Sequence, residues 1–249
     1  MSALISAELL KLRTTRTGVS LIASVVGFVV LISFVAALTG KPPSTTRDTL
    51  DTLSIASFAQ PFALVLGLLA VTTEFRHGTI TPTLIVAPDK LRLVLAKLVA
   101  HVLAGLALGI LASGLCAAIL LPIVAGRGGA SPASSDVVKV IVGQVVGTAL
   151  WAAVGVGLGA LVRNQVGAIV GALGWVFVGE HLLGILPAGI GDGVDKYGSN
   201  GASSALSATS GGPGADHISQ VSGGLLMLLY ALVLLAAGIV AMRRRDITQ

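Results

Sequence analysis

Six long apolar stretches limit what this chain can fold into more than any other feature of its sequence. A helix needs about 20 apolar residues to cross the hydrocarbon of a bilayer, and each stretch is long enough to do so. The stretches cover residues 18–38, 54–73, 95–125, 140–162, 166–186 and 223–242. Only 11% of the side chains are charged, against about 25% in a typical soluble domain. The sequence therefore predicts an all-α, polytopic membrane protein with six transmembrane helices in one domain over residues 1–249.

The basic residues indicate how these helices are oriented, because Lys and Arg are enriched in the cytoplasmic loops of membrane proteins. If the N-terminus is cytoplasmic, most of them fall on that side: Lys11, Arg13, Arg16, Arg76, Lys90, Arg92, Lys97, Arg163, Arg243, Arg244 and Arg245. The other side then holds Lys41, Arg47, Arg127, Lys139 and Lys196. We therefore expect both termini in the cytoplasm. We attribute the net charge of +5 to this topology rather than to nucleic-acid binding.

The residues before the first apolar stretch form a separate element. Leu4, Ile5, Leu9 and Leu12 fall within about 140° of one another on a helical wheel. This pattern predicts an amphipathic interfacial helix over residues 2–16, lying on the inner leaflet. The alternative is a frayed terminus. Glu8 falls inside the apolar arc, so the amphipathicity is imperfect.

The sequence offers little for catalysis. A phosphate-binding loop needs G-x-x-x-x-G-K-[ST], but Gly40-Lys41 is followed by Pro42 and lacks the upstream glycine. The single cysteine, Cys116, excludes an internal disulfide and a cysteine metal cluster. We therefore expect no enzyme activity, and no catalytic, cofactor or metal site, in this chain.

Glu180 and His181 lie near the outer end of the fifth apolar stretch. Ionisable residues inside membrane spans are costly, and they are functional candidates for that reason. We interpret these two as polar residues of an outer gate; the alternative is that both are hydrated at the membrane interface. Of the outer segment that follows, we expect 186–191 to fold back as a re-entrant or interfacial element. We expect 199–213 to form a flexible loop, since this part is rich in Gly and Ser.

Glycines in the fourth apolar stretch predict close helix packing. Gly155, Gly157 and Gly159 alternate along one short run. Small residues allow helix backbones to approach closely in lipid, where packing replaces the hydrophobic driving force. We therefore expect the fourth helix to be tightly packed.

The polar connection between the second and third stretches is the most informative loop. Glu74 ends the second stretch, and Gly78-Thr79 interrupts the helix. Pro82 suits the first turn of a short helix over 82–86, and Asp89 is a good N-cap for the helix from Lys90 onward. The apolar face of the short helix would contact either the bilayer surface or a partner protein.

This loop carries a resemblance to a known family. Glu74-x-x-x-Gly78-Thr79-Ile80, Leu84, Pro88, Arg92 and Ala96-Lys97, between the second and third of six spans, resemble the permease subunit of type-two ABC exporters. The span layout and the amphipathic start agree over the whole chain. Arg76 and His77 stand where many members have an acid. The resemblance implies a coupling helix that fits a groove on a separate ATPase, through the loop residues Glu74, Arg76, Gly78, Thr79, Leu84, Pro88, Lys90, Arg92 and Lys97.

The resemblance also implies a function. Two identical or related permease chains would pair in a bacterial-type plasma membrane and bind two ABC ATPase subunits, which hold ATP and magnesium. The largely apolar spans favour a hydrophobic or amphipathic substrate. Two alternatives remain: an ion-coupled secondary carrier, which should show mid-membrane charges or broken helices, and a non-transporting membrane scaffold. The sequence does not select a substrate, an ATPase, or a homodimer over a heterodimer.

Overall fold

The computed structural model describes residues 1–80, 89–162, 164–187, 189–208 and 218–244, and over these ranges every regular element is helical. Six helical segments are long and apolar enough to cross a membrane. They cover Arg16–Thr39, Thr46–Arg76, Lys90–Gly126, Ser134–Leu161, Gln165–Gly184 and Gln220–Arg243. Each overlaps one of the predicted stretches. The prediction of an all-helical, multi-pass membrane protein is therefore confirmed at this level.

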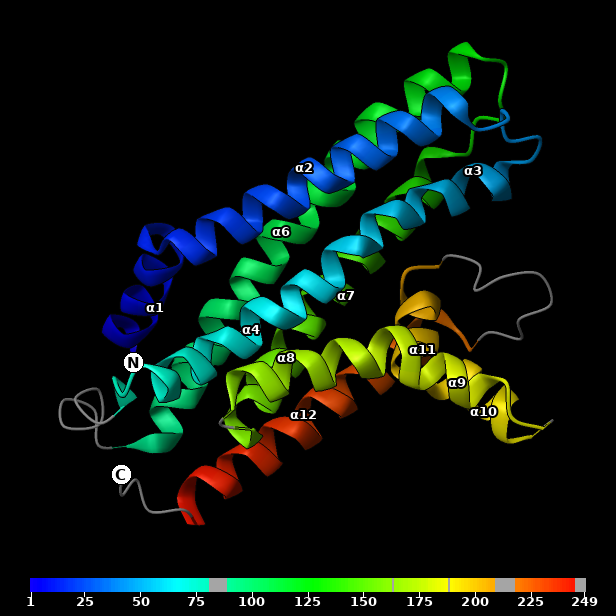
Figure 1. Cartoon of the computed structure of the whole chain (residues 1–249). Helices are drawn as coiled ribbons and strands as arrows, with labels where there is room; N and C mark the ends of the chain where they lie inside the picture. The colour runs from blue at the N-terminus through cyan, green and yellow to red at the C-terminus, as the bar shows by residue number, and fades with distance from the viewer. Residues whose placement is uncertain (81–88, 163, 188, 209–217, 245–249) are drawn as a thin grey trace.

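Several crossing segments are built from more than one element (Figure 1). Helix α1 spans Ser2–Thr14 and helix α2 spans Arg16–Thr39, with Thr15 as the α2 N-cap. The second crossing joins α3 (Thr46–Thr52), a 3₁₀ turn (Leu53–Phe58) and α4 (Ala59–Arg76). The third, fourth and sixth crossings are single helices: α6 (Lys90–Gly126), α7 (Ser134–Leu161) and α12 (Gln220–Arg244). The fifth crossing consists of α8 (Gln165–Gly174), a π-helical turn (Trp175–Gly179) and α9 (Glu180–Gly184).

Helix α7 occupies the centre of the bundle and packs against α4, α6 and α12. Glycines make this packing close. A Cβ added at Gly155 would lie 2.1 Å from the Leu64 carbonyl oxygen of α4, and one at Gly157 would lie 2.6 Å from the Leu235 nitrogen of α12. No side chain fits in those gaps. The expectation of a tightly packed fourth helix is confirmed, because its glycines let two neighbours approach at backbone distance.

The connections gather at the two ends of the bundle. Helix α1, the end of α4, the start of α6 and the end of α12 lie at one end (Figure 1). Helices α3, α10 (Ile190–Tyr197) and α11 (Ser199–Leu206) lie at the other. We call the first end the loop end and the second the α11 end. The sequence-based orientation, with the loop end in the cytoplasm, stays a prediction.

The expectation of a flexible loop over 199–213 is wrong for its first part. Ser199–Leu206 forms helix α11, whose residues Ala202, Ser203, Ala205 and Leu206 are buried. The Gly- and Ser-rich composition suits close packing on α12. A side chain does not fit at Gly223 of α12, because backbone atoms of Ala202 and Leu206 in α11 lie too close. The composition of this segment is typical of a loop, although the segment is a packed helix. Residues 209–213 lie outside the described part of the chain.

The N-terminal helix forms as expected, but its apolar arc does not face away from the protein. Leu4, Ile5, Leu9 and Leu12 are half-buried, and Glu8 between them is buried. Helix α1 packs on α6 and α2 through this arc. A clean division into an apolar and a polar face is not seen, and the interfacial position stays a prediction.

Candidate functional site

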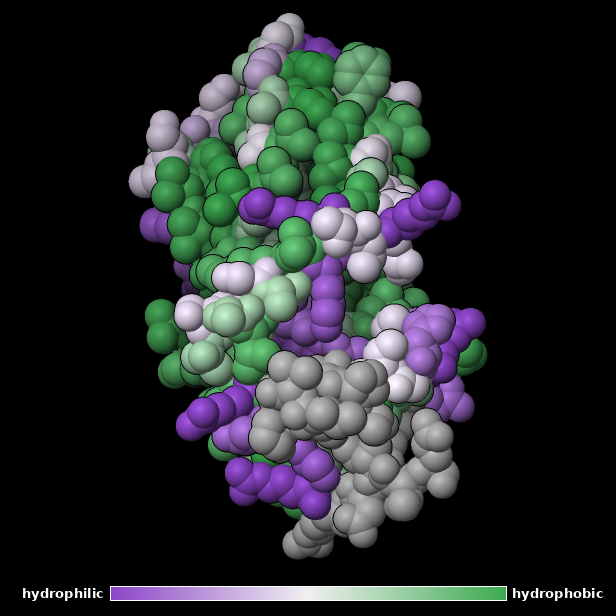
Figure 2. All heavy atoms as spheres, turned by 90° about the vertical axis from the view of Figure 1, so that its left-hand side faces the viewer, coloured by the Kyte–Doolittle hydropathy of each residue, from purple (hydrophilic) through white to green (hydrophobic). Residues whose placement is uncertain are grey.

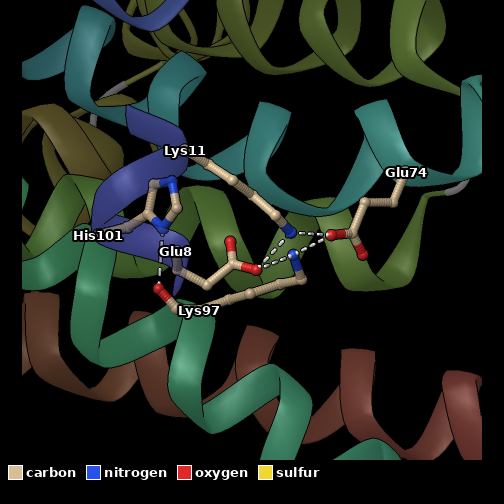
Figure 3. A network of polar contacts seen from close by, with 5 residues as sticks. All are labelled: Glu8, Lys11, Glu74, Lys97 and His101. Carbon is tan, nitrogen blue, oxygen red and sulfur yellow. Dashed lines mark hydrogen bonds and ion pairs between the residues drawn. The ribbon is translucent and has the colours of Figure 1, made fainter. Parts of the chain in front are cut away.

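Four charged side chains from three helices meet at the loop end of the bundle (Figure 3). The Lys97 ammonium of α6 donates to the Glu74 Oε1 atom of α4 at 2.7 Å and to the Glu8 Oε1 atom of α1 at 3.0 Å. The Lys11 ammonium donates to the same two oxygens at 2.7 Å (Glu8) and 2.8 Å (Glu74). We call these four residues the ion-pair network. Each cation contacts both carboxylates, so the network links α1, α4 and α6.

The network is deeply buried and balanced in charge. The Lys97 side chain is 1% exposed, and those of Glu8 and Glu74 are 6% and 8% exposed. Two acids and two bases cancel, which offsets the large cost of removing charges from water. Lys11 is the one half-exposed member and closes the network toward solvent.

The neighbours shift the pKa values of the two α1 residues. Burial by itself raises the pKa of the Glu8 carboxyl, but the Lys97 and Lys11 ammonium groups outweigh it and hold the pKa below its ordinary value of 4.5. Burial by itself lowers the pKa of Lys11. Hydrogen bonds to Glu74 and Glu8 outweigh it, so the pKa of Lys11 is raised above 10.5. Both shifts favour the charged forms that the network needs.

His101 extends the network by one helical turn. Its Nδ1 atom lies 2.9 Å from the Lys97 carbonyl oxygen, and the ring is buried (Figure 3). Glu74 keeps one carboxylate oxygen, Oε2, buried without a hydrogen-bond partner. Glu74 is thus held through Oε1 alone, by both cations.

Two further hydrogen bonds connect the flanks of the 74–97 loop to other helices. The Arg76 guanidinium donates to the Gln165 side-chain oxygen at the start of α8, at 3.3 Å. The Lys90 ammonium donates to the Met242 carbonyl oxygen near the end of α12, at 3.1 Å. Both flanks of the loop are therefore bonded to helices that lie far away in the sequence.

The chain enters and leaves the loop as predicted. Helix α4 ends at Arg76, and Gly78 follows with a φ of +65°, the left-handed conformation that suits glycine. Asp89 accepts hydrogen bonds from the Leu91 and Arg92 amides, so its prediction as the N-cap of α6 is confirmed. Ile80 is buried in an apolar cluster with α4, α6, α7 and α12 residues. The predicted helix over 82–86, with Leu84, and also Pro88, lies outside the described residues.

The surface around the network is basic. Figure 2 views the molecule from the side on which α1 lies in Figure 1; hydrophilic side chains gather over the middle and lower parts of this face, whereas its upper part is mostly hydrophobic. Exposed basic residues of the loop end include Arg13, Arg16, Arg76, Arg92 and Arg243. Arg92 also pairs with Asp89 at 3.1 Å. Such a surface complements an acidic patch on a partner.

Near the α11 end, the structure separates the two polar residues predicted for an outer gate. Glu180 is 5% exposed, whereas His181 is exposed. The Glu180 carboxylate accepts from the Ser199 amide at 2.8 Å and from the Ser199 hydroxyl, both at Oε1, and from the Asn200 amide at 2.8 Å, at Oε2. The Trp175 indole donates to Oε1 at 3.1 Å. Glu180 therefore caps the first turn of α11, and its role in a gate stays a prediction.

Sequence reasoning missed two members of the ion-pair network. Glu8 and Lys11 lie in the N-terminal helix, far in sequence from Glu74 and Lys97. Glu8, inside the apolar arc of residues 2–16, was the feature of the sequence that indicated this network. An acid on a helix face that packs against other helices needs a buried cation beside it. Among the described residues, no group of three or more His, Cys, Asp or Glu side chains is placed to hold a metal ion.

Compared with known proteins, the chain matches no family model and no curated protein.

Proposed function

We propose that this chain is the permease subunit of a type-two ABC exporter that moves a hydrophobic or amphipathic substrate across a bacterial-type plasma membrane. One observation carries the proposal. The 74–97 loop is flanked by the ion-pair network and bonded to α8 and α12, so that a force applied to the loop reaches α1, α4, α6, α8 and α12.

This arrangement suits a coupling element. A loop that contacted only its own two helices would move with little effect on the rest of the bundle. Here Glu74 and Lys97 share their charge contacts with α1, while Arg76 and Lys90 bond to α8 and α12. Nucleotide binding to a partner could then favour one of two arrangements of the bundle, as a ligand favours the state that it binds better.

The proposal requires partners. A separate ABC ATPase would bind ATP and magnesium and dock on the basic loop end, and a second permease chain, identical or related, would complete the translocation path. The loop end and both termini would face the cytoplasm, in agreement with the positive-inside distribution of Lys and Arg.

Co-purification tests this proposal. The chain would be co-expressed with candidate ATPases from its own genome and purified in a mild detergent. We expect a complex of two permeases with two ATPases, whose ATPase rate exceeds that of the ATPase alone. A chain that purifies without any ATPase would contradict the proposal and favour a carrier or a scaffold.

A matched pair of glycine variants makes the test specific to the loop. Gly78 and Gly128 both have positive φ, and a Cβ at either would meet no atom within 4 Å. Valine costs about 1–2 kcal/mol of backbone strain at each position. Gly78→Val should lower ATPase stimulation severalfold, whereas Gly128→Val, at the opposite end of the bundle, should leave it unchanged. Equal behaviour of the two variants would show that the loop has no special role.

One observation favours a second candidate, an ion-coupled carrier. The fifth crossing contains a π-helical turn followed directly by the buried Glu180. Interrupted helices and ionisable residues within spans are features of secondary transporters. Transport in proteoliposomes that needs an ion gradient but no ATPase would support this function over the first.

A further inference from the structure

An apolar cavity of about 710 Å³ lies between α7, α8 and α12. Most of its wall is aliphatic, including Leu158, Val162, Ala168, Ala172, Val233 and Leu234. Protein cavities that bind small molecules usually measure about 300–1,000 Å³ and are mainly apolar, with a few polar groups. The size and lining of this cavity fall within that description.

The cavity is long and has one polar end. Its lining runs along the fifth crossing from Gly167 to Glu180, which corresponds to about 20 Å at the helical rise per residue. Trp175, Tyr197 and Tyr230 line the same end as Glu180. The Tyr230 hydroxyl donates to the Tyr197 carbonyl oxygen, and this bond links α12 to α10.

In the part of the chain that the structure describes, no cation forms an ion pair with the Glu180 carboxylate. Its donors are two backbone amides, one hydroxyl and one indole, all neutral. Lys196 is close in sequence, but its ammonium lies 5.9 Å from the Tyr197 ring centroid and Lys196 does not line the cavity. The Oε2 atom accepts one hydrogen bond, from the Asn200 amide.

From these observations we infer that the cavity binds an amphiphile with a single apolar chain and a cationic ammonium head. The chain fills the aliphatic part, and the head lies at the end formed by Glu180 and the aromatic residues. A buried carboxylate attracts a cation strongly because little water screens it. The faces of Trp and Tyr rings attract ammonium groups as well. As a statement about transported cargo the inference rests on the proposed export function, but binding itself does not.

Intrinsic fluorescence reports on this site directly. The chain has two tryptophans, Trp151 and Trp175, and both line the cavity. The protein would be placed in phosphatidylcholine nanodiscs and titrated with decyltrimethylammonium, decanol and decyl sulfate, which share one chain and differ in head charge. We expect decyltrimethylammonium to change the tryptophan fluorescence saturably at the lowest concentration. Decanol should give a weaker change in fluorescence, and decyl sulfate none.

Glu180→Gln removes the charge from the cavity. It should weaken decyltrimethylammonium binding about tenfold, because the electrostatic attraction between the carboxylate and the cationic head is lost, and leave decanol binding unchanged. Asp136→Asn is the matched control, since this acid lies at the start of α7 in an exposed pair with Lys139. The control should bind all three compounds like the wild type. Unchanged cation binding in Glu180→Gln, or equal loss of cation and decanol, would overturn the inference.

A second variant tests the cavity independently of Glu180. Gly171 lines the cavity, and a Cβ there meets no atom within 4 Å, so Gly171→Leu fills space without a clash at Cβ. This variant should lose binding of the cation and of decanol while still purifying as a folded protein. Wild-type binding by a folded Gly171→Leu would place the ligand elsewhere and overturn the inference. Binding by a chain that never associates with an ATPase would keep this inference and reject the export function.

Discussion

At the loop end, Glu8 and Glu74 are buried beside Lys11 and Lys97, whereas toward the α11 end Glu180 is buried beside neutral donors only. At both sites the buried carboxylates accept several hydrogen bonds, although the Oε2 atom of Glu74 has no hydrogen-bond partner. The first site also cancels the charge, and the second does not. A balanced network holds helices together, while a carboxylate with only neutral donors suits the cationic ligand that we propose for the cavity.

The position of each site in the chain agrees with this difference. The ion-pair network joins three helices at the flanks of a loop that we propose contacts an ATPase. Glu180 holds one short helix, α11, at the end of an open apolar cavity. We therefore expect changes in the network to affect the stability of the whole bundle, and changes at Glu180 to affect α11 and the cavity.

The largest effect should come from Lys97→Met. This change leaves Lys11 as the remaining cation beside two buried carboxylates. Removing one partner of a buried ion pair destabilises a protein by about 3–5 kcal/mol. Thermal unfolding in detergent, followed by circular dichroism, would measure it. Lys139→Met is the control, because its pair with Asp136 is exposed and such pairs contribute about 0–1 kcal/mol. Similar losses in both variants would remove the distinction between a buried network and a surface pair.

A smaller, local effect should follow Glu180→Ala. The Ser199 and Asn200 amides and the Trp175 indole lose their acceptor, and a buried donor left without one costs about 1–3 kcal/mol. Hydrogen exchange followed by mass spectrometry should show faster exchange in α11 and little change at the loop end. Faster exchange across the entire bundle would mean that Glu180 has the global role that we assign to the network.

The smallest effect should appear in the pH dependence of stability. The pKa of Glu8 is lowered in the folded protein, so its contribution is present above about pH 4.5 and is lost as the pH falls through the folded value. The pKa of Lys11 is raised, so its contribution is present below about pH 10.5 and is lost as the pH rises through the folded value. Both contributions are therefore present between these limits.

Glu8→Gln provides the comparison for that profile. Its unfolding temperature should fall less steeply below pH 4.5 than that of the wild type, since the variant has no carboxylate at this position to protonate. If the unfolding temperatures of the two proteins fell equally steeply below pH 4.5, Glu8 would contribute no pH-dependent stability.

Much of the fold could be predicted because its signals are local. Twenty or more apolar residues in a row predict a crossing helix wherever they occur, and all six were found this way. Asp89 was identified as an N-cap because a cap bonds to amides two or three residues away. Helix α11 was missed because its stability comes from α12 and Glu180, and its own Gly- and Ser-rich sequence is typical of a loop.

By itself, then, the sequence determined the helical class, the six helices long and apolar enough to cross a membrane, and Asp89 as the N-cap of α6, since each depends on residues close together in the chain. Only the tertiary structure decided which charges meet. Lys97 pairs with Glu8 across 89 positions, and Glu180 bonds to Ser199 across 19. Neither pairing has a local signature, because helix packing alone brings these residues within a few ångströms. The same packing determines that one acidic site faces two lysines and that the other faces neutral hydrogen-bond donors at the end of a cavity.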